Sequence, residues 1–254
     1  MLILCGSYVG FMEREVLGRK SPLFGRRTGQ ILLRPFSYRE AAAFHPGWSR
    51  EEQARASFIC GGVPLYLRFF DPKQSVEKNI ETTILDEFAP LFREPDFLLR
   101  EELREVESYY AVLLAIADGH GNHRAIAQRT GLAERSLHYY TNELTQLGYV
   151  TKRYPLSGSP PAKRHVRYVL DDPLLRFWFR FVFPNLSFVQ HAGPARAFRE
   201  RIRPELPAYF GLCFARLCRE AMPHLYEKRG LNASCQVGEY WDKNVQASSP
   251  VARK

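Results

Sequence analysis

Residues 133–150 bring together polar side chains that can hydrogen-bond to nucleic acid bases. In the stretch AERSLHYYTNELTQLGYV, steps of 100° per residue place apolar side chains on one side of a helix and polar ones on the other. The polar side carries Arg135, His138, Tyr139, Asn142 and Gln146. Because guanidinium and amide groups can each form paired hydrogen bonds with a base edge in the major groove, this face is a candidate for base contacts.

Cationic side chains follow directly. The runs GYVTKRY and HVRYVL have strand-like composition and flank the polar turn PLSGSPPAKR, which predicts a β-hairpin wing. Residues 151–170 contain no acidic residue, and their cations are Lys152, Arg153, Lys163, Arg164 and Arg167. A wing of one charge sign is suited to DNA phosphates. Glu134 and Glu143, which flank the polar helix face, oppose such binding, and the alternative is a module used for packing or protein contacts.

Two further helices would position this face. In FLLREELREVESYYAVLLAIADG, apolar residues recur on one helical face and predict a single long helix. NHRAIAQRTGL predicts a short helix that ends at Gly131. With the polar helix and the hairpin they predict a winged helix-turn-helix that binds double-stranded DNA.

Composition favours a soluble cytoplasmic protein. The 254 residues include 36 Lys and Arg against 27 Asp and Glu, a net charge of +9 that suggests polyanionic partners. The five cysteines lack a CxxC pair and argue against a zinc site or a disulfide framework. The most apolar stretch, residues 174–189, contains Arg176 and Arg180, so no membrane span is expected.

The N-terminal residues read as part of an α/β domain. LILCGS and GQILLRPF predict two buried strands of a parallel sheet, and helices are expected after the cap residues Ser37 and Ser49. Two strands do not make a buried parallel sheet, which predicts that the chain opens inside a domain.

Several motifs in order resemble one family. ILCGSYVGFME, SPLFGRRTGQILLRPFSYREAAAF and CGGVPLYL are similar to the later half of archaeal-type ATPases of the AAA+/STAND kind. The winged helix and DDPLLRFWFRFVFPN resemble the continuation of that family, where a PD-(D/E)xK nuclease-like domain of unknown function follows. The resemblance implies an α/β plus α fold. Its parts would be the end of a P-loop ATPase core (1–36), a helical lid (37–95), the winged helix-turn-helix (96–170), an incomplete α/β nuclease-like domain (171–246) and a disordered tail (247–254).

The resemblance also implies nucleotide-binding residues. Ser7 corresponds to the sensor residue that faces the γ-phosphate, although it could instead cap the next helix. Arg26 and Arg27 could stabilise phosphoryl charge or be a solvated loop pair. Gly62 and Pro64, in GGVP, match the lid motif near the nucleotide base and are also compatible with a helix stop and restart.

The departures from the family concern catalysis. The complete family uses ATP and Mg²⁺, but this chain has no GxxxxGK[ST] loop and no strand ending in paired acidic residues ahead of Ser7. On the nuclease side, Ala215 stands where the family usually has Glu, and no E-x-K strand follows. The first hypothesis is therefore a DNA-binding part without nucleotide hydrolysis, cofactor or metal. The alternative is an ATPase component whose P-loop half is encoded upstream or on a separate chain, with a homo-oligomer as a further option.

Overall fold

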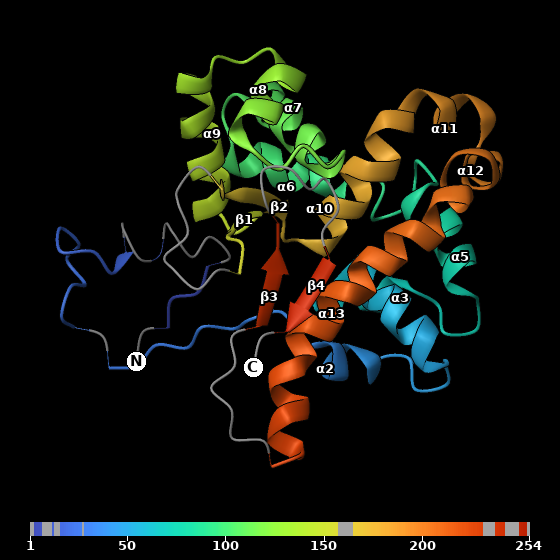
Figure 1. Cartoon of the computed structure of the whole chain (residues 1–254), viewed down its shortest axis with the longest axis horizontal. Coiled ribbons are helices and arrows are strands. Elements are labelled where there is room, and N and C mark those ends of the chain that lie inside the picture. Colours follow the sequence, from blue (N-terminus) through green and yellow to red (C-terminus); the bar gives the residue numbers. More distant parts are fainter. Residues whose placement is uncertain are drawn as a thin grey trace.

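A computed structural model of the chain describes residues 3–6, 12, 16–26, 28–156, 165–230 and 237–241, together with the backbone of 249–252. In this part of the chain the fold is mainly helical, with two small antiparallel sheets of two strands each (Figure 1). Of the predicted site residues, Ser7, Arg27, Lys163 and Arg164 lie outside the described residues.

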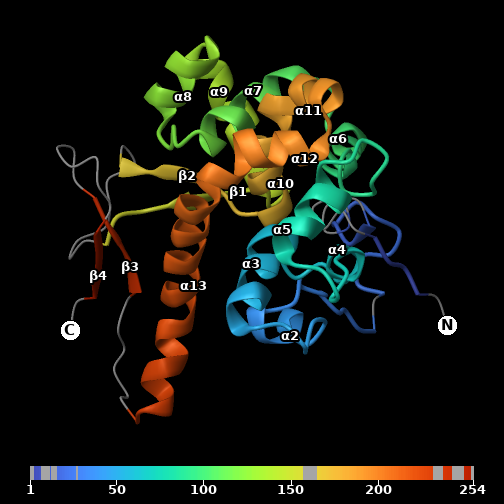
Figure 2. The same ribbon diagram turned by 90° about the vertical axis from the view of Figure 1, so that its right-hand side faces the viewer.

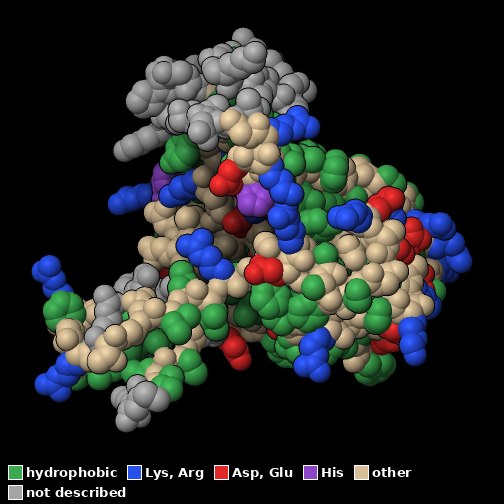
Figure 3. Space-filling model, turned by 90° about the horizontal axis from the view of Figure 1, so that it is seen from below, with side chains coloured by type: hydrophobic (Ala, Val, Ile, Leu, Met, Phe, Trp, Pro, Cys, Tyr) green, Lys and Arg blue, Asp and Glu red, His purple; other side chains and the backbone are tan. Residues whose placement is uncertain are grey.

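The described N-terminal residues lack the two predicted strands. Residues 3–6 and 29–37 have no regular secondary structure, so the strand predictions are wrong for these residues. Ile31 and Leu33 are 86% and 88% exposed, because no neighbouring strand covers them in the described part of the chain. Figure 3 shows this segment as the projection at the left, with hydrophobic side chains on its surface.

Helices begin where the serine caps predict them. Helix α2 spans Tyr38–Ala42 and follows Ser37, whose N–H donates to the Glu40 carboxylate at 2.8 Å. Helix α3 spans Arg50–Cys60 and follows Ser49, whose hydroxyl accepts from the N–H of Glu52. The following elements are α4 (Pro64–Phe69), α5 (Val76–Asn79) and a π-helical turn (Ile80–Ile84).

Glycines end α3 and hold the N-terminal segment against it. Gly61 has φ 62°, which ends the helix. The carbonyl of Gly62 accepts from the N–H of Phe36 at 2.8 Å. A Cβ atom on Gly62 would lie 2.0 Å from the Phe36 carbonyl oxygen, so this close backbone approach requires glycine.

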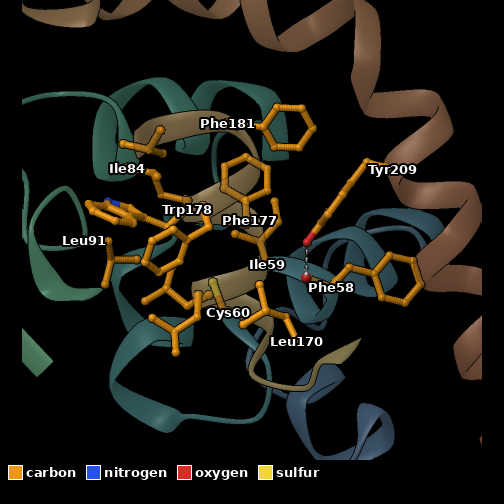
Figure 4. Packing of buried hydrophobic residues seen from close by; sticks show 14 of the residues in the cluster. Phe58, Ile59, Cys60, Ile84, Leu91, Leu170, Phe177, Trp178, Phe181 and Tyr209 are labelled. Atoms are coloured by element: carbon orange, nitrogen blue, oxygen red, sulfur yellow. Dashed lines mark hydrogen bonds between the residues drawn. The ribbon is translucent and has the colours of Figure 1, made fainter. Parts of the chain in front are cut away.

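The centre of the core is an aromatic segment. Helix α10 (Pro173–Phe177) runs into a π-helical turn (Trp178–Val182). The rings of this segment lie against α3 and against Tyr209 of α13 (Leu206–Lys228) (Figure 4). The Trp178 indole N–H donates to the Phe92 carbonyl at 2.7 Å, and the Tyr209 hydroxyl donates to the Phe58 carbonyl at 3.2 Å. Because buried residues from Ala41 to Cys213 belong to one cluster, the predicted segments after residue 37 share a continuous core.

The long helix predicted over 97–119 is divided. Helix α6 spans Glu94–Glu102 and α7 spans Val106–Ala117. Between them Leu103 is buried and extended, with φ −121° and ψ 136°. The Tyr149 hydroxyl donates to the Glu102 carboxylate, so tertiary contacts at the end of α6 accompany the break that local periodicity does not reveal.

The predicted helices and hairpin after α7 are present. Helix α8 spans His123–Thr130 and ends at Gly131, and α9 spans Glu134–Gln146. Strands β1 (Val150–Arg153) and β2 (Arg167–Leu170) pair antiparallel, with Val150 opposite Leu170.

The C-terminal part packs beside this hairpin. Helices α11 (Leu186–Ala192) and α12 (Pro194–Ala197) lead to α13 (Leu206–Lys228). Strand β3 (Val237–Tyr240) lies beside α13 (Figure 2). It pairs antiparallel with β4 (Ser249–Ala252), which falls where the sequence predicts a disordered tail. Among the described residues, no helix combines the length and apolar character needed to cross a membrane.

Candidate nucleic-acid interface

Helix α9 has one buried face and one open face. Its inner side buries Leu137, Thr141 and Leu144 where α9 packs against α7 and α8. Four residues of the predicted polar face lie on the solvent side and are exposed; they are Arg135, His138, Tyr139 and Asn142. The structure therefore brings these four residues together on a helix whose opposite face is fixed by packing.

One histidine links α8, α9 and β2. His123 begins α8, and its ring centroid lies 4.1 Å from that of His138. Its Nε2 is 2.8 Å from the Tyr168 hydroxyl, in hydrogen-bonding contact. Burial lowers the pKa of His123, and the neighbouring His138 lowers it further. This contact positions the polar face of α9 relative to the hairpin.

Lys152 joins the hairpin to α9. Its Nζ donates to the Asn142 side-chain oxygen at 2.9 Å and lies 5.9 Å from the Tyr168 ring centroid. A cation from β1 thus stands directly beside the amide predicted to contact bases. This pair makes the helix face and the hairpin one continuous polar surface.

The other described hairpin cations have partners from later parts of the chain. The guanidinium of Arg153 lies 3.8 Å from the Asp171 carboxylate, which also pairs with Arg216 of α13. The guanidinium of Arg167 stacks over the Trp241 ring at 4.6 Å from its centroid. The predicted wing is therefore partly occupied by intramolecular contacts.

Strand β3 is held against the hairpin by more than this stacking. The Trp241 indole N–H donates to the His165 carbonyl at 3.0 Å, and the N–H of Leu156 donates to the Glu239 carbonyl at 2.6 Å. The Glu239 carboxylate also pairs with Arg219 of α13 at 2.5 Å. This ion pair with Arg219 gives Glu239 a structural role.

The residues carried over from the ATPase resemblance are not gathered into one described site. Arg26 is exposed, next to a turn that its own N–H closes on the Leu23 carbonyl. Gly62 is buried against the backbone of Phe36, and Pro64 is the exposed first residue of α4. The sequence contains neither a phosphate-binding lysine loop nor paired acidic ligands ahead of Ser7.

No group of three or more His, Cys, Asp or Glu side chains suitable for a metal ion occurs in the described part of the chain. The two glutamates of α9, Glu134 and Glu143, differ in their surroundings. Glu134 is exposed in the first turn of the helix, whereas Glu143 faces the neighbouring α6–α7 junction together with Tyr140.

Comparison with known proteins gives two matches. Residues 178–247 match the family DUF234, described as archaeal and bacterial proteins of unknown function. An uncharacterized protein of Methanocaldococcus jannaschii, MJECL04, is 29% identical over 252 residues, which cover 96% of this chain. The chain spans 55% of the length of that relative. No solved structure matches the chain significantly.

Proposed function

We propose that α9 and the β1–β2 hairpin bind double-stranded DNA as a winged helix-turn-helix. The observation that carries this proposal is the exposure of Arg135, His138, Tyr139 and Asn142 on one face of a helix whose other face is buried. In the proposed mode α9 enters the major groove, where Arg135 and Asn142 form hydrogen bonds with base edges.

The hairpin supplies the electrostatic part of this binding. Lys152, beside Asn142, would contact a phosphate next to the bases that α9 reads. The net charge of +9 supports attraction to a polyanion over the whole molecule. In this proposal the chain is the DNA-binding part of a protein related to the archaeal-type AAA+/STAND ATPases, and it hydrolyses no nucleotide by itself.

Fluorescence anisotropy of a labelled duplex, titrated at several salt concentrations, tests the DNA proposal. Lys152→Ala should weaken binding to all duplexes and lower the log–log salt slope by about one. Asn142→Ala should cost about 1–3 kcal/mol on a preferred site with little effect on other duplexes. Lys73→Ala removes one exposed charge before α5 and is the matched control. Absence of binding at low salt, or an equal effect of Lys73→Ala, would overturn the proposal.

A second candidate function follows from the exposed apolar residues of the N-terminal segment. Ile3, Ile31, Leu32 and Leu33 are more than half exposed, as strands of a parallel sheet would be without their neighbours. In this alternative the chain completes an ATPase whose P-loop half lies upstream or on another chain. Calorimetry with ATP and Mg²⁺ tests the first proposal, because micromolar affinity of this chain alone would contradict its lack of a nucleotide site.

A further inference from the structure

A pocket lies where α9 faces the break between α6 and α7. Its volume is about 560 Å³. It is lined by Glu102, Leu103, Arg104, Glu105, Tyr109, Ser136, Tyr139, Tyr140 and Glu143. The α9 residues recur every three or four positions, so they share one face of the helix. The pocket exists because the chain leaves the helical path between α6 and α7, where a continuous helix is predicted from the sequence.

Three tyrosines form its aromatic wall. The Tyr140 ring is nearly perpendicular to the Tyr109 ring, at 88° and a centroid distance of 4.9 Å. It makes an angle of 74° with the Tyr139 ring, at 5.5 Å. Because the rings are nearly perpendicular, their faces point in different directions. An aromatic face attracts a cation through its quadrupole.

The charged groups of the lining give the pocket a negative balance. Three glutamates, from the α6–α7 junction and from α9, stand against the single cation Arg104. Glu102 is partly buried, and burial raises the pKa of its carboxyl, while the hydrogen bond from Tyr149 lowers it. A cation in the pocket would stabilise the ionised form of this carboxylate.

We propose that this pocket binds the alkylammonium group of an organic amine. In this proposal the carboxylates neutralise the ammonium charge, and Tyr139 and Tyr140 turn their ring faces toward it. The buried Tyr109 contacts the alkyl chain. The volume is within the range of small-molecule sites and far exceeds that of a bare metal ion, which needs converging oxygen ligands. The ammonium could belong to a free polyamine or to a lysine side chain.

This proposal does not depend on DNA binding, although the two sites share Tyr139. The pocket opens on the side of α9 that carries Ser136, Tyr140 and Glu143, next to the face that carries Arg135 and Asn142. An amine would therefore bind beside the DNA-facing surface and not in place of its base-contacting groups. Failure of DNA binding would leave the amine proposal to be judged by its own measurement.

The test is calorimetry on the full chain at about 150 mM salt, an ionic strength that screens exposed charges. The probes are spermidine and Nα-acetyl-lysine methylamide, with 1,4-butanediol as the uncharged comparison. Binding of spermidine alone identifies a free polyamine, and binding of the lysine derivative identifies a side chain as the source. Either result, with no heat from the diol, supports the alkylammonium site.

Two exposed or partly exposed positions give variants that should keep the fold. Glu143→Gln retains the shape of the side chain and removes its charge, and Tyr139→Ala removes one aromatic wall. Each should weaken amine binding about tenfold, while Glu87→Gln, an exposed glutamate outside the pocket, should leave it unchanged. Circular dichroism verifies folding. No binding of either amine at millimolar concentration, or equal affinity of Glu143→Gln and wild type, would overturn the proposal.

Discussion

Two apolar stretches of this chain differ in burial. Residues 174–182 bury nearly every ring in the core, whereas the similarly apolar residues 31–33 are exposed. The two stretches differ in their neighbours. Helices α3, α7 and α13 pack around residues 174–182. No strand pairs with residues 31–33 in the described part of the chain. Apolar composition therefore predicts a tendency to be buried, and the burial itself depends on what else the chain provides.

The largest effect on stability should come from removing a large side chain from the buried stretch. Trp178→Ala removes a fully buried ring and leaves the Phe92 carbonyl without its indole donor. We expect a loss of about 3–5 kcal/mol in the free energy of unfolding, as for other large-to-small core changes. Urea denaturation followed by circular dichroism measures it. A loss below about 1 kcal/mol would mean that the aromatic segment is not the centre of the core.

A smaller and more local effect is expected at Gly62, where the N-terminal segment that contains residues 31–33 is held against the end of α3. In Gly62→Ala the new Cβ atom would collide with the Phe36 carbonyl oxygen. We expect the N-terminal segment to detach from Gly62, which relieves this collision. The free energy of unfolding should fall by about 1–3 kcal/mol. Limited chymotrypsin digestion should then cut faster after Phe36, whose N–H is bonded to Gly62 in the wild type.

The matched control for that change is Gly211→Ala. Gly211 lies inside α13, and a Cβ atom there has no neighbour within 4 Å. Alanine should stabilise the helix by about 0.5–1 kcal/mol and leave chymotrypsin cleavage after Phe36 unchanged. Equal cleavage of both variants would contradict the anchoring role of Gly62.

Protonation of His45 should lower the stability of the folded protein at acidic pH. Burial lowers the pKa of His45, and its hydrogen bond with the Phe70 carbonyl offsets this in part. Because the unfolded chain then binds the proton more readily, this contribution is complete above the unfolded pKa of about 6.5 and is lost as pH falls through the folded pKa. Thermal denaturation between pH 7.5 and 5 should show the loss.

Replacing His45 separates this effect from general acid sensitivity. His45→Gln should flatten the pH dependence of the melting temperature, even though it lowers the melting temperature at neutral pH. His191→Gln, at an exposed histidine of α11, should retain the wild-type slope. A wild-type slope in His45→Gln would assign the pH dependence to other groups.

The smallest effect on stability is expected in the exposed stretch. Replacing Ile31 and Leu33 with serine should change the free energy of unfolding by less than about 0.5 kcal/mol, because neither side chain is buried. The same change should reduce self-association, which analytical ultracentrifugation measures, since exposed apolar surface promotes contacts between molecules. A large loss of stability would show that these residues are buried in solution.

The sequence predicted the helices better than the strands near the N-terminus. The capped starts at Ser37 and Ser49, the stop at Gly131 and the polar face of α9 are local signals, and each is present in the structure. The strands over 3–6 and 29–36 would need backbone partners that no local pattern supplies.

The candidate sites show the same limit. Arg135 and Asn142 share a face because helical spacing dictates it, so the sequence alone could place them. The break at Leu103 depends on burial and on contacts with a residue far along the chain, so the tyrosine pocket was not predictable from periodicity. The stacking of Arg167 with Trp241 joins residues from separate segments for the same reason.

That stacking makes Trp241 an internal optical probe of the hairpin. Of the three tryptophans in the chain, Trp48 and Trp178 donate to carbonyls of Pro72 and Phe92 in the helical body. Trp241 alone lies beside a hairpin guanidinium, and indole emission responds to a charge so close to the ring. Any ligand that draws Arg167 away should shift the fluorescence of this one residue, which permits a label-free titration of the hairpin.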